Sequence, residues 1–194
     1  MKYIDSLALS ELVERFEEAL SDGSKKFSAN LSLLSTKRIK ADKKLYGSLS
    51  ESPISSTDIS VKSLSYLIST LNLLYPYYDF SSVRLSQFTK VDPPATAIAH
   101  LQNIFYENLA DNSFNDLAFS FYSILEDTID PWECEVFSYT PEVGIDSDPL
   151  TDNGSLWSIN YFFHNKKLRR LLFLCFSMFP NHEQMSEDDM FDMM

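Results

Sequence analysis

The sequence predicts an α+β protein, with a single domain built on a largely antiparallel sheet, a C-terminal hairpin and helices packed on the faces of the sheet. Apolar residues with helical spacing fill the middle of the chain, whereas the clearest alternating segments lie near its end, with one weaker strand near the start. Separation of helices and strands along the chain is typical of α+β folds. The two strands of a hairpin are antiparallel by necessity.

The hairpin is predicted between residues 154 and 179. Side chains alternate between the two faces of a strand, so residues 156–163 present one face of Trp157, Ile159, Tyr161 and Phe163 and another of Leu156, Ser158, Asn160 and Phe162. Asn165 is expected to enter the turn, because Asn tolerates positive φ. A hairpin this apolar cannot stay exposed, so it is predicted to form the centre of the sheet.

The remaining elements follow from periodicity and helix-breaking residues. Residues 6–21 carry a helical stripe and end at Asp22-Gly23. A strand over residues 26–34 and a short basic helix over residues 40–49 follow. Further helices are predicted over 62–75, which ends at Pro76, from Pro93 to Leu109, and from a cap at Ser113 to Ile129. Residues 77–81 are expected to be extended, and residues 132–139 alternate like a strand.

Two segments lack a consistent apolar period. Residues 47–60 are rich in serine and contain Pro53, which predicts a mobile loop. Residues 181–194 form an acidic tail with too little apolar content to fold alone. The expected organisation is one globular domain over residues 1–180, with the loop inside it and the tail after it.

Charge is distributed unevenly along the chain. The net charge of the 194 residues is −12, and no Lys or Arg lies between Val91 and Asn165. This stretch disfavours direct nucleic-acid binding, because phosphates would be repelled, and it favours a basic protein partner. Plain solubility is the alternative explanation. The candidate acidic face for a partner consists of Asp111, Asp116, Glu126 and Asp127.

No catalytic motif, cofactor site or metal-ligand spacing is recognisable in the sequence, and no apolar run reaches the length of a membrane span. Cys134 and Cys175 are expected to be buried, reduced hydrophobic residues. These features favour a binding protein without catalysis and without a cofactor. The alternatives are an intracellular enzyme whose site residues are scattered, and a generic acidic adaptor.

Three blocks of sequence carry a family resemblance. They are the segment W-S-x-N-Y-F-F-x-N-K-K-L-R-R from Trp157, the amino terminus MKYIDSLALSEL with TKRIKADKKLY from Thr36, and YLISTLNLLYPYYDFSSVRLSQF from Tyr66. In this order they resemble the eukaryotic repressor of RNA polymerase III, the Maf-one family. The resemblance implies a regulator that binds the polymerase at its clamp region and contacts the initiation factor TFIIIB, and so blocks recruitment to the promoter.

The resemblance also implies roles for particular residues. It implies a phosphoprotein that shuttles between nucleus and cytoplasm and meets protein kinases and phosphatases, with the Ser-rich loop as the controlled segment. The phosphorylation candidates are Ser48, Ser50, Ser52, Ser55 and Ser56. The nuclear import candidates, for which a solvated turn is the alternative, are Lys166, Lys167, Arg169 and Arg170. The family block residues, expected to be mainly structural, are Trp157, Ser158, Asn160, Tyr161, Phe162, Phe163, Asp79 and Phe80.

Overall fold

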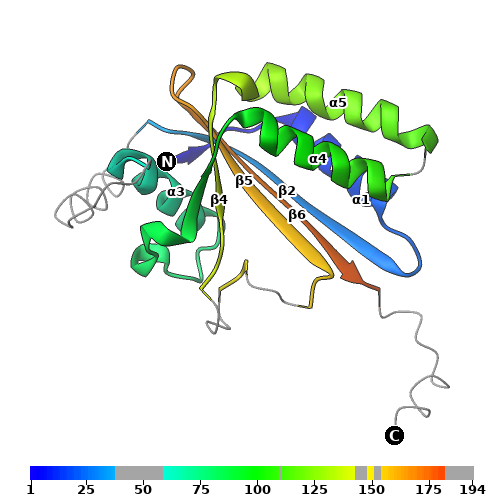
Figure 1. Ribbon diagram of the computed structural model, residues 1–194, viewed down its shortest axis with the longest axis horizontal. Helices are drawn as coiled ribbons and strands as arrows, with labels where there is room; N and C mark the ends of the chain where they lie inside the picture. Colours follow the sequence, from blue (N-terminus) through cyan, green and yellow to red (C-terminus); the bar gives the residue numbers. More distant parts are fainter. Residues whose placement is uncertain (38–58, 110, 143–147, 151–153, 182–194) are drawn as a thin grey trace, which may run out of the picture.

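A six-stranded sheet forms the centre of the protein (Figure 1). The computed structural model describes residues 1–37, 59–109, 111–142, 148–150 and 154–181. The strand order is β1-β2-β6-β5-β4-β3, and every neighbouring pair is antiparallel. This confirms the predicted α+β class and the central C-terminal hairpin. The strands are β1 (Lys2–Tyr3), β2 (Lys25–Ser35), β3 (Phe88–Val91), β4 (Glu135–Tyr139), β5 (Trp157–Asn165) and β6 (Arg170–Pro180).

Helices cover both faces of the sheet (Figure 1). On one face lie α1 (Leu7–Leu20), α4 (Pro94–Asn108) and α5 (Asp111–Ile129), and on the other lies α3 (Val61–Leu74). Ser6 and Ser60 are the N-cap residues of α1 and α3, because each hydroxyl accepts a hydrogen bond from the backbone N–H three residues later. The short 3-10 helices are η1 (Phe80–Ser82), η2 (Leu85–Gln87) and η3 (Pro131–Glu133).

The larger core cluster lies between the sheet and the three helices α1, α4 and α5. Phe16 of α1 is its centre, since its ring centroid lies 4.9 Å from that of Phe105, 5.7 Å from that of Phe121 and 5.3 Å from that of Phe176. These four side chains come from all three helices and from β6, and each is fully buried. The ring contacts therefore tie the helical layer to the middle of the sheet.

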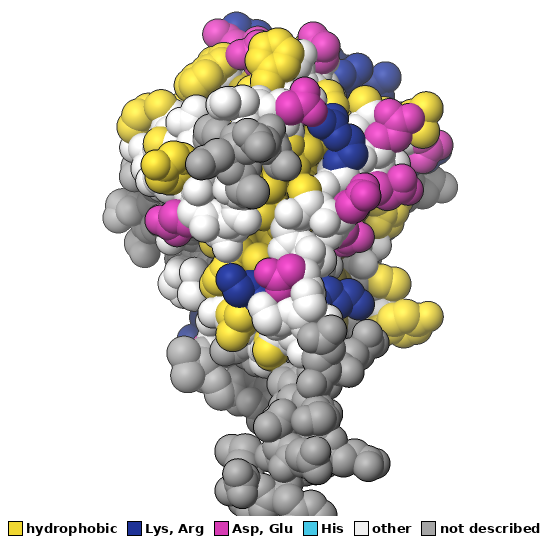
Figure 2. Space-filling model, turned by 90° about the vertical axis from the view of Figure 1, so that its right-hand side faces the viewer, with side chains coloured by type: hydrophobic (Ala, Val, Ile, Leu, Met, Phe, Trp, Pro, Cys, Tyr) yellow, Lys and Arg dark blue, Asp and Glu magenta, His cyan; other side chains and the backbone are white. Residues whose placement is uncertain are grey.

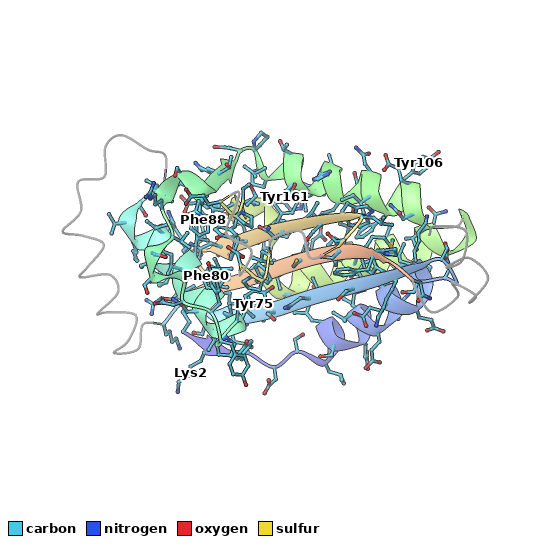
Figure 3. The ribbon with its side chains drawn as sticks, turned by 90° about the horizontal axis from the view of Figure 1, so that it is seen from below. Lys2, Tyr75, Phe80, Phe88, Tyr106 and Tyr161 are labelled. Atoms are coloured by element: carbon cyan, nitrogen blue, oxygen red, sulfur yellow. The ribbon has the colours of Figure 1, made fainter. Side chains whose placement is uncertain are left out.

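The second core cluster lies between the sheet and α3. Phe162 of β5 and Phe173 of β6 face this side, with ring centroids 4.9 Å apart. Phe80 and Phe88 close the cluster beside α3 and are labelled in Figure 3, where Tyr106 projects from the outer side of α4. Since β5 and β6 place side chains in both clusters, the hairpin is buried on both faces.

The structure corrects several details of the sequence interpretation. Asn165 is the last residue of β5, paired with Arg170, and Arg169 is the turn residue with positive φ, at 54°. Trp132 belongs to η3, so the strand predicted over 132–139 begins only at Glu135. Helix α5 begins at Asp111, ahead of the cap expected at Ser113. The predicted extended segment 77–81 instead runs into η1, because Phe80 turns into the core.

Two strands were not predicted, and three predicted segments lie wholly or mostly outside the described residues. Strands β1 and β3 were not predicted, because two and four residues are too few for a periodic signal. The predicted basic helix over 40–49, most of the Ser-rich loop and the acidic tail beyond Asn181 lie outside the described residues. Within the described chain, no helix combines the length and apolar character needed to span a membrane.

Replacing Phe16 with Ala tests the role of the ring cluster. The change removes a fully buried ring and leaves a cavity among three helices and the sheet, so the free energy of unfolding should fall by about 3–5 kcal/mol in urea titration. The matched control is Phe119→Ala on α5, where the side chain is 74% exposed and the loss should stay within about 0.5 kcal/mol. Equal effects of the two changes would contradict this account of the core.

Candidate functional site

Among the described residues, the candidate functional features are charged surfaces, and no metal-ligand cluster or reactive thiol is found. No group of three or more His, Cys, Asp or Glu side chains among them is arranged to hold a metal ion. Cys134 and Cys175 are free and buried, and burial raises the pKa of the Cys134 thiol to about 12. A thiol with so high a pKa is a poor nucleophile at neutral pH. The charged surfaces are therefore the candidate functional features of the described residues.

The predicted acidic face lies on the outer side of α5. Leu117, Phe121 and Leu125 direct the helix towards the sheet, which leaves Asp116, Glu126 and Asp127 exposed on the opposite side. Asp111 is the first residue of the helix, and its side chain lies outside the described ones. Three of the four predicted carboxylates thus share the solvent side of one helix, although Asp116 lies about 15 Å along the axis from Glu126.

The acidic surface extends onto α1, which the sequence interpretation missed. Arg15 of α1 donates to Asp116 of α5 at 2.8 Å, with both side chains partly exposed, so the pair contributes little stability. Glu11 and Glu18 lie one turn before and after Arg15 and share its side of α1. Figure 2 shows Asp and Glu side chains gathered on this side of the molecule, with a few Lys and Arg among them. The i, i+7 spacing of Glu11 and Glu18 in the sequence could have indicated that both lie on one side of the helix.

An apolar hollow adjoins the C-terminal end of the acidic face. It has a volume of about 330 Å³, and its lining comes from α4, α5 and η3. Trp132 of η3 lines it while remaining 54% exposed, and its Nε1 donates to the carboxylate of Glu126 at 3.4 Å. Trp is enriched among the residues that anchor protein interfaces, so this half-exposed side chain is a candidate anchor. Sequence reasoning missed Trp132 because it was assigned to a strand.

The four cations of the hairpin turn have different environments. Lys166 pairs with Glu135 at 2.7 Å, and Lys167 pairs with Glu133. Arg170 is half-buried and donates from Nη1 to the backbone carbonyl of Thr128 at 2.8 Å, near the C-terminal end of α5. Arg169 is exposed. Arg170 therefore has a structural contact, and only three of the four nuclear import candidates are displayed at the surface.

The family block supports the sheet. Tyr161, Phe162 and Phe163 are buried, Trp157 is half-buried, and Ser158 is exposed with its hydroxyl 2.8 Å from that of Ser177. The Asn160 amide accepts from the Tyr139 N–H at 2.8 Å and donates to the Tyr139 carbonyl at 2.9 Å. This side chain thus continues the β4–β5 contact two residues beyond Phe137, the last residue of β4 that pairs with β5.

The second part of the family block fixes η1. The Asp79 carboxylate accepts hydrogen bonds from the hydroxyl of Ser81 and from its backbone N–H, the latter at 2.9 Å, and these two bonds hold the pKa of Asp79 below its ordinary value. Phe80 is fully buried, with its ring centroid 4.4 Å from that of Tyr78. The structure gives both residues a folding role. The five candidate phosphorylation serines, from Ser48 to Ser56, lie outside the described residues.

His164 is the most unusual titratable group beside the turn. It is 3% exposed, and no described residue forms a hydrogen bond with its Nδ1. Burial lowers the pKa of His164 to about 4; Glu135 opposes the shift, while Lys166 and Lys62 add to it. The imidazole is therefore neutral at pH 7. The sequence did not predict the inward position of this histidine.

An antiparallel sheet covered on both faces, with an acidic helical surface and a basic hairpin turn, defines an α+β protein whose described surfaces suit contact with partners. A family model described as Maf1 regulator matches residues 10–175. The chain belongs to this family.

Relatives and a solved structure agree with this membership. The chain is 36% identical over 118 residues to a repressor of RNA polymerase III transcription from Dictyostelium discoideum, covering 61% of this chain and 41% of that protein. It is 34% identical over 117 residues to the repressor maf1 of Schizosaccharomyces pombe, covering 59% and 46%. The chain thus spans less than half the length of these two relatives. The crystal structure of citrus MAF1 matches with a TM-score of 0.75 and 32% identity, covering 91% of this chain and 98% of that one.

The buried imidazole predicts a pH dependence of stability. The folded-state pKa of His164 lies below the unfolded value near 6.5, so the unfolded chain binds the extra proton first as the pH falls. Stability should therefore decline between about pH 6.5 and pH 4, by up to about 3 kcal/mol from this group. His164→Gln should remove that part of the decline in urea unfolding measured at pH 7 and pH 4.

The control for this experiment is His100→Gln on α4. His100 is exposed and its Nδ1 lies 2.7 Å from the Tyr161 hydroxyl, so it shares the residue type without the burial. This variant should keep the parental decline. If His164→Gln also kept it, the low pKa of His164 would be refuted.

Proposed function

We propose that the chain represses transcription by RNA polymerase III, binding the polymerase rather than catalysing a reaction. The observation that carries the proposal is the family membership: the Maf1 regulator model matches residues 10–175, and two relatives are named repressors of RNA polymerase III transcription. The match to 98% of the citrus MAF1 chain adds that the whole fold is shared with a member of the family.

In this proposal the repressor acts by occupying its partner. It binds the polymerase at the clamp region and contacts TFIIIB, so that the polymerase cannot join its promoter-bound factor. The acidic surface of α5 and α1 supplies the complement to a basic partner surface, because exposed carboxylates steer and orient such a partner. Trp132 beside Glu126 supplies the apolar anchor.

Regulation completes the proposal. The chain moves between nucleus and cytoplasm, and protein kinases and phosphatases act on the Ser-rich segment from Ser48 to Ser56. A phosphate at any of these serines adds about −1.5 to −2 charge. The exposed cations Lys166, Lys167 and Arg169 of the hairpin turn serve nuclear import.

Charge reversal tests the acidic surface. The double variant Glu126→Lys/Asp127→Lys changes two exposed side chains of α5, so the fold should persist while the affinity for purified RNA polymerase III falls about tenfold or more. The loss should appear mainly in the association rate, and the salt dependence of that rate should weaken. Surface plasmon resonance at two salt concentrations measures both quantities.

The matched control reverses two carboxylates away from α5. Asp5 precedes α1 and Glu142 lies beyond β4, and both are exposed. Asp5→Lys/Glu142→Lys makes the same change in net charge, so it should leave polymerase affinity within about twofold. If both double variants bound equally well, the α5 surface would not be the contact, although repression itself would stand. If the unchanged chain failed to bind the polymerase, the proposed function would be wrong.

A triple variant tests the nuclear import candidates. Lys166→Ala, Lys167→Ala and Arg169→Ala are changed together, and Arg170 is kept because it holds the end of α5. In a full-chain fusion to a reporter too large for passive entry, nuclear fluorescence should drop severalfold. Lys25→Ala/Lys26→Ala, on the exposed end of β2, is the control and should enter the nucleus normally. Undiminished entry of the triple variant would exclude the turn as the import signal.

A further inference from the structure

A cavity lies where three distant parts of the chain meet. It has a volume of about 450 Å³. The segment that follows β2 contributes Thr36 and Lys37, and the hairpin tip contributes His164, Lys166 and Arg169. The N-cap and first turns of α3 contribute Ser60, Lys62, Ser63 and Tyr66. Thr36 is held beside the turn because its backbone N–H donates to the carbonyl of Arg169 at 2.9 Å. The cavity is therefore built by the fold and does not depend on a single loop.

The lining of this cavity is strongly positive. Four of its residues are cations: Lys37, Lys62, Lys166 and Arg169. Lys166 is paired with Glu135, but the salt bridges among the described residues provide no carboxylate for the other three. Bringing like charges together in a partly enclosed space is unfavourable unless an anion joins them. The net charge of the chain is −12, so this group of cations is opposite in sign to the protein as a whole.

The hydrogen-bonding groups of the cavity suit an oxyanion. Ser60 is the N-cap of α3, a helix of 14 residues, so the cavity faces the positive end of a helix dipole. Thr36, Ser60 and Ser63 add hydroxyl groups; those of Ser60 and Ser63 lie 3.0 Å apart, and that of Ser63 also donates to the Glu135 carboxylate at 3.4 Å. Hydroxyl donors, ammonium and guanidinium groups together form the donor set that phosphate oxygens prefer.

His164 provides an independent indication of a ligand. Its side chain lines the cavity although the residue is 97% buried, and its Nδ1 finds no partner in the described part of the chain. The Tyr66 ring packs edge-on against the imidazole, with centroids 5.2 Å apart, and fixes its orientation. An unpaired buried polar atom costs free energy, so such an atom in a native fold calls for an explanation. An anion in the cavity next to it gives one.

We propose that this cavity is a binding site for a phosphate group. Its volume far exceeds the ~30 Å³ of a water molecule, which leaves room for a phosphate and for the first atoms of whatever carries it. Two sources share this chemistry: free phosphate, and a phosphoserine side chain. The Ser-rich segment leaves the described structure after Lys37 and rejoins it at Ile59, so both of its ends lie at or next to the cavity.

The first experiment uses inorganic phosphate and the full, unphosphorylated chain. At constant ionic strength, phosphate at ten times its dissociation constant should raise the melting temperature by about 3–5 °C. Lys62→Gln/Arg169→Gln should abolish the increase. The control Lys25→Gln/Lys26→Gln removes two exposed cations from the other end of β2 and should retain it. No increase in the unchanged chain, or the same increase in the cavity variant, overturns the proposal.

A second readout separates binding from a purely structural role. The His164 ring resonances should shift on addition of phosphate, and the pKa of His164 should rise, because a nearby anion favours the imidazolium. The ring of His100, which is remote from the cavity lining, should not respond. Equal responses of the two rings would indicate unspecific binding and would refute the site.

A final arm distinguishes the sources. The peptide SLSESPISS, residues 48–56, is compared with and without phosphate on Ser52. Tighter binding of the phosphopeptide than of inorganic phosphate identifies phosphoserine as the ligand, whereas equal affinity identifies free phosphate. Binding of the unphosphorylated peptide with the same affinity as the phosphopeptide would show that phosphate is not recognised, and would overturn the proposal. Failure here leaves the polymerase contact untouched, since that contact involves the acidic surface of α5.

Discussion

Burial of the β5–β6 hairpin on both faces is the constraint on which the rest of the structure depends. Alternate residues of β6 enter opposite clusters: Phe176 meets Phe16 on the side of α1, and Phe173 meets Phe162 on the side of α3. A strand with two apolar faces is unstable unless helices cover both, so this hairpin requires a helical layer on each side. The positions of α1, α3, α4 and α5 follow from that requirement.

The hairpin tip contacts α5, η3 and β4 at the surface of the protein. Arg170 holds the carbonyl of Thr128 near the end of α5, while Lys167 and Lys166 reach Glu133 of η3 and Glu135 of β4. Asn165 adds a hydrogen bond from its amide to the carbonyl of Ile129 at 2.9 Å. The exposed ion pairs contribute little energy individually, but the buried amide and the half-buried guanidinium fix how α5 leaves the sheet. The acidic surface of α5 is thus positioned by the basic turn.

The sequence could predict the helices and strands in which the apolar pattern repeats several times. The stripe of α1 and the alternation of β5 repeat often enough to identify both element and buried face, as Phe16 and Phe163 show. Strands β1 and β3 could not be found, because they exist only through pairing with β2 and β4. Trp132 was misassigned, because Pro131 starts a 3-10 turn that interrupts the apparent alternation.

Of the two charged surfaces, the sequence could predict the acidic one and could not predict the basic cavity. The carboxylates of α5 were found from composition, since the absence of Lys and Arg between Val91 and Asn165 needs no structure to be seen. The basic cavity was not found, because its residues are contributed by three segments, and charge along the chain does not reveal charge across a fold. His164 lies next to the turn in the sequence, and only the tertiary structure shows that its ring is enclosed.

The basic cavity and the acidic surface of α5 are linked through the hairpin tip, because Arg169 lines the cavity and its neighbour Arg170 donates to the Thr128 carbonyl of α5. Lys166 lines the cavity and also pairs with Glu135 of β4, and Ser63 of the same lining donates from its hydroxyl to that carboxylate at 3.4 Å. An anion that draws Lys166 into the cavity would weaken that pair and add negative charge next to β4. The effect on a basic partner would then be electrostatic and local, and the core would not need to move.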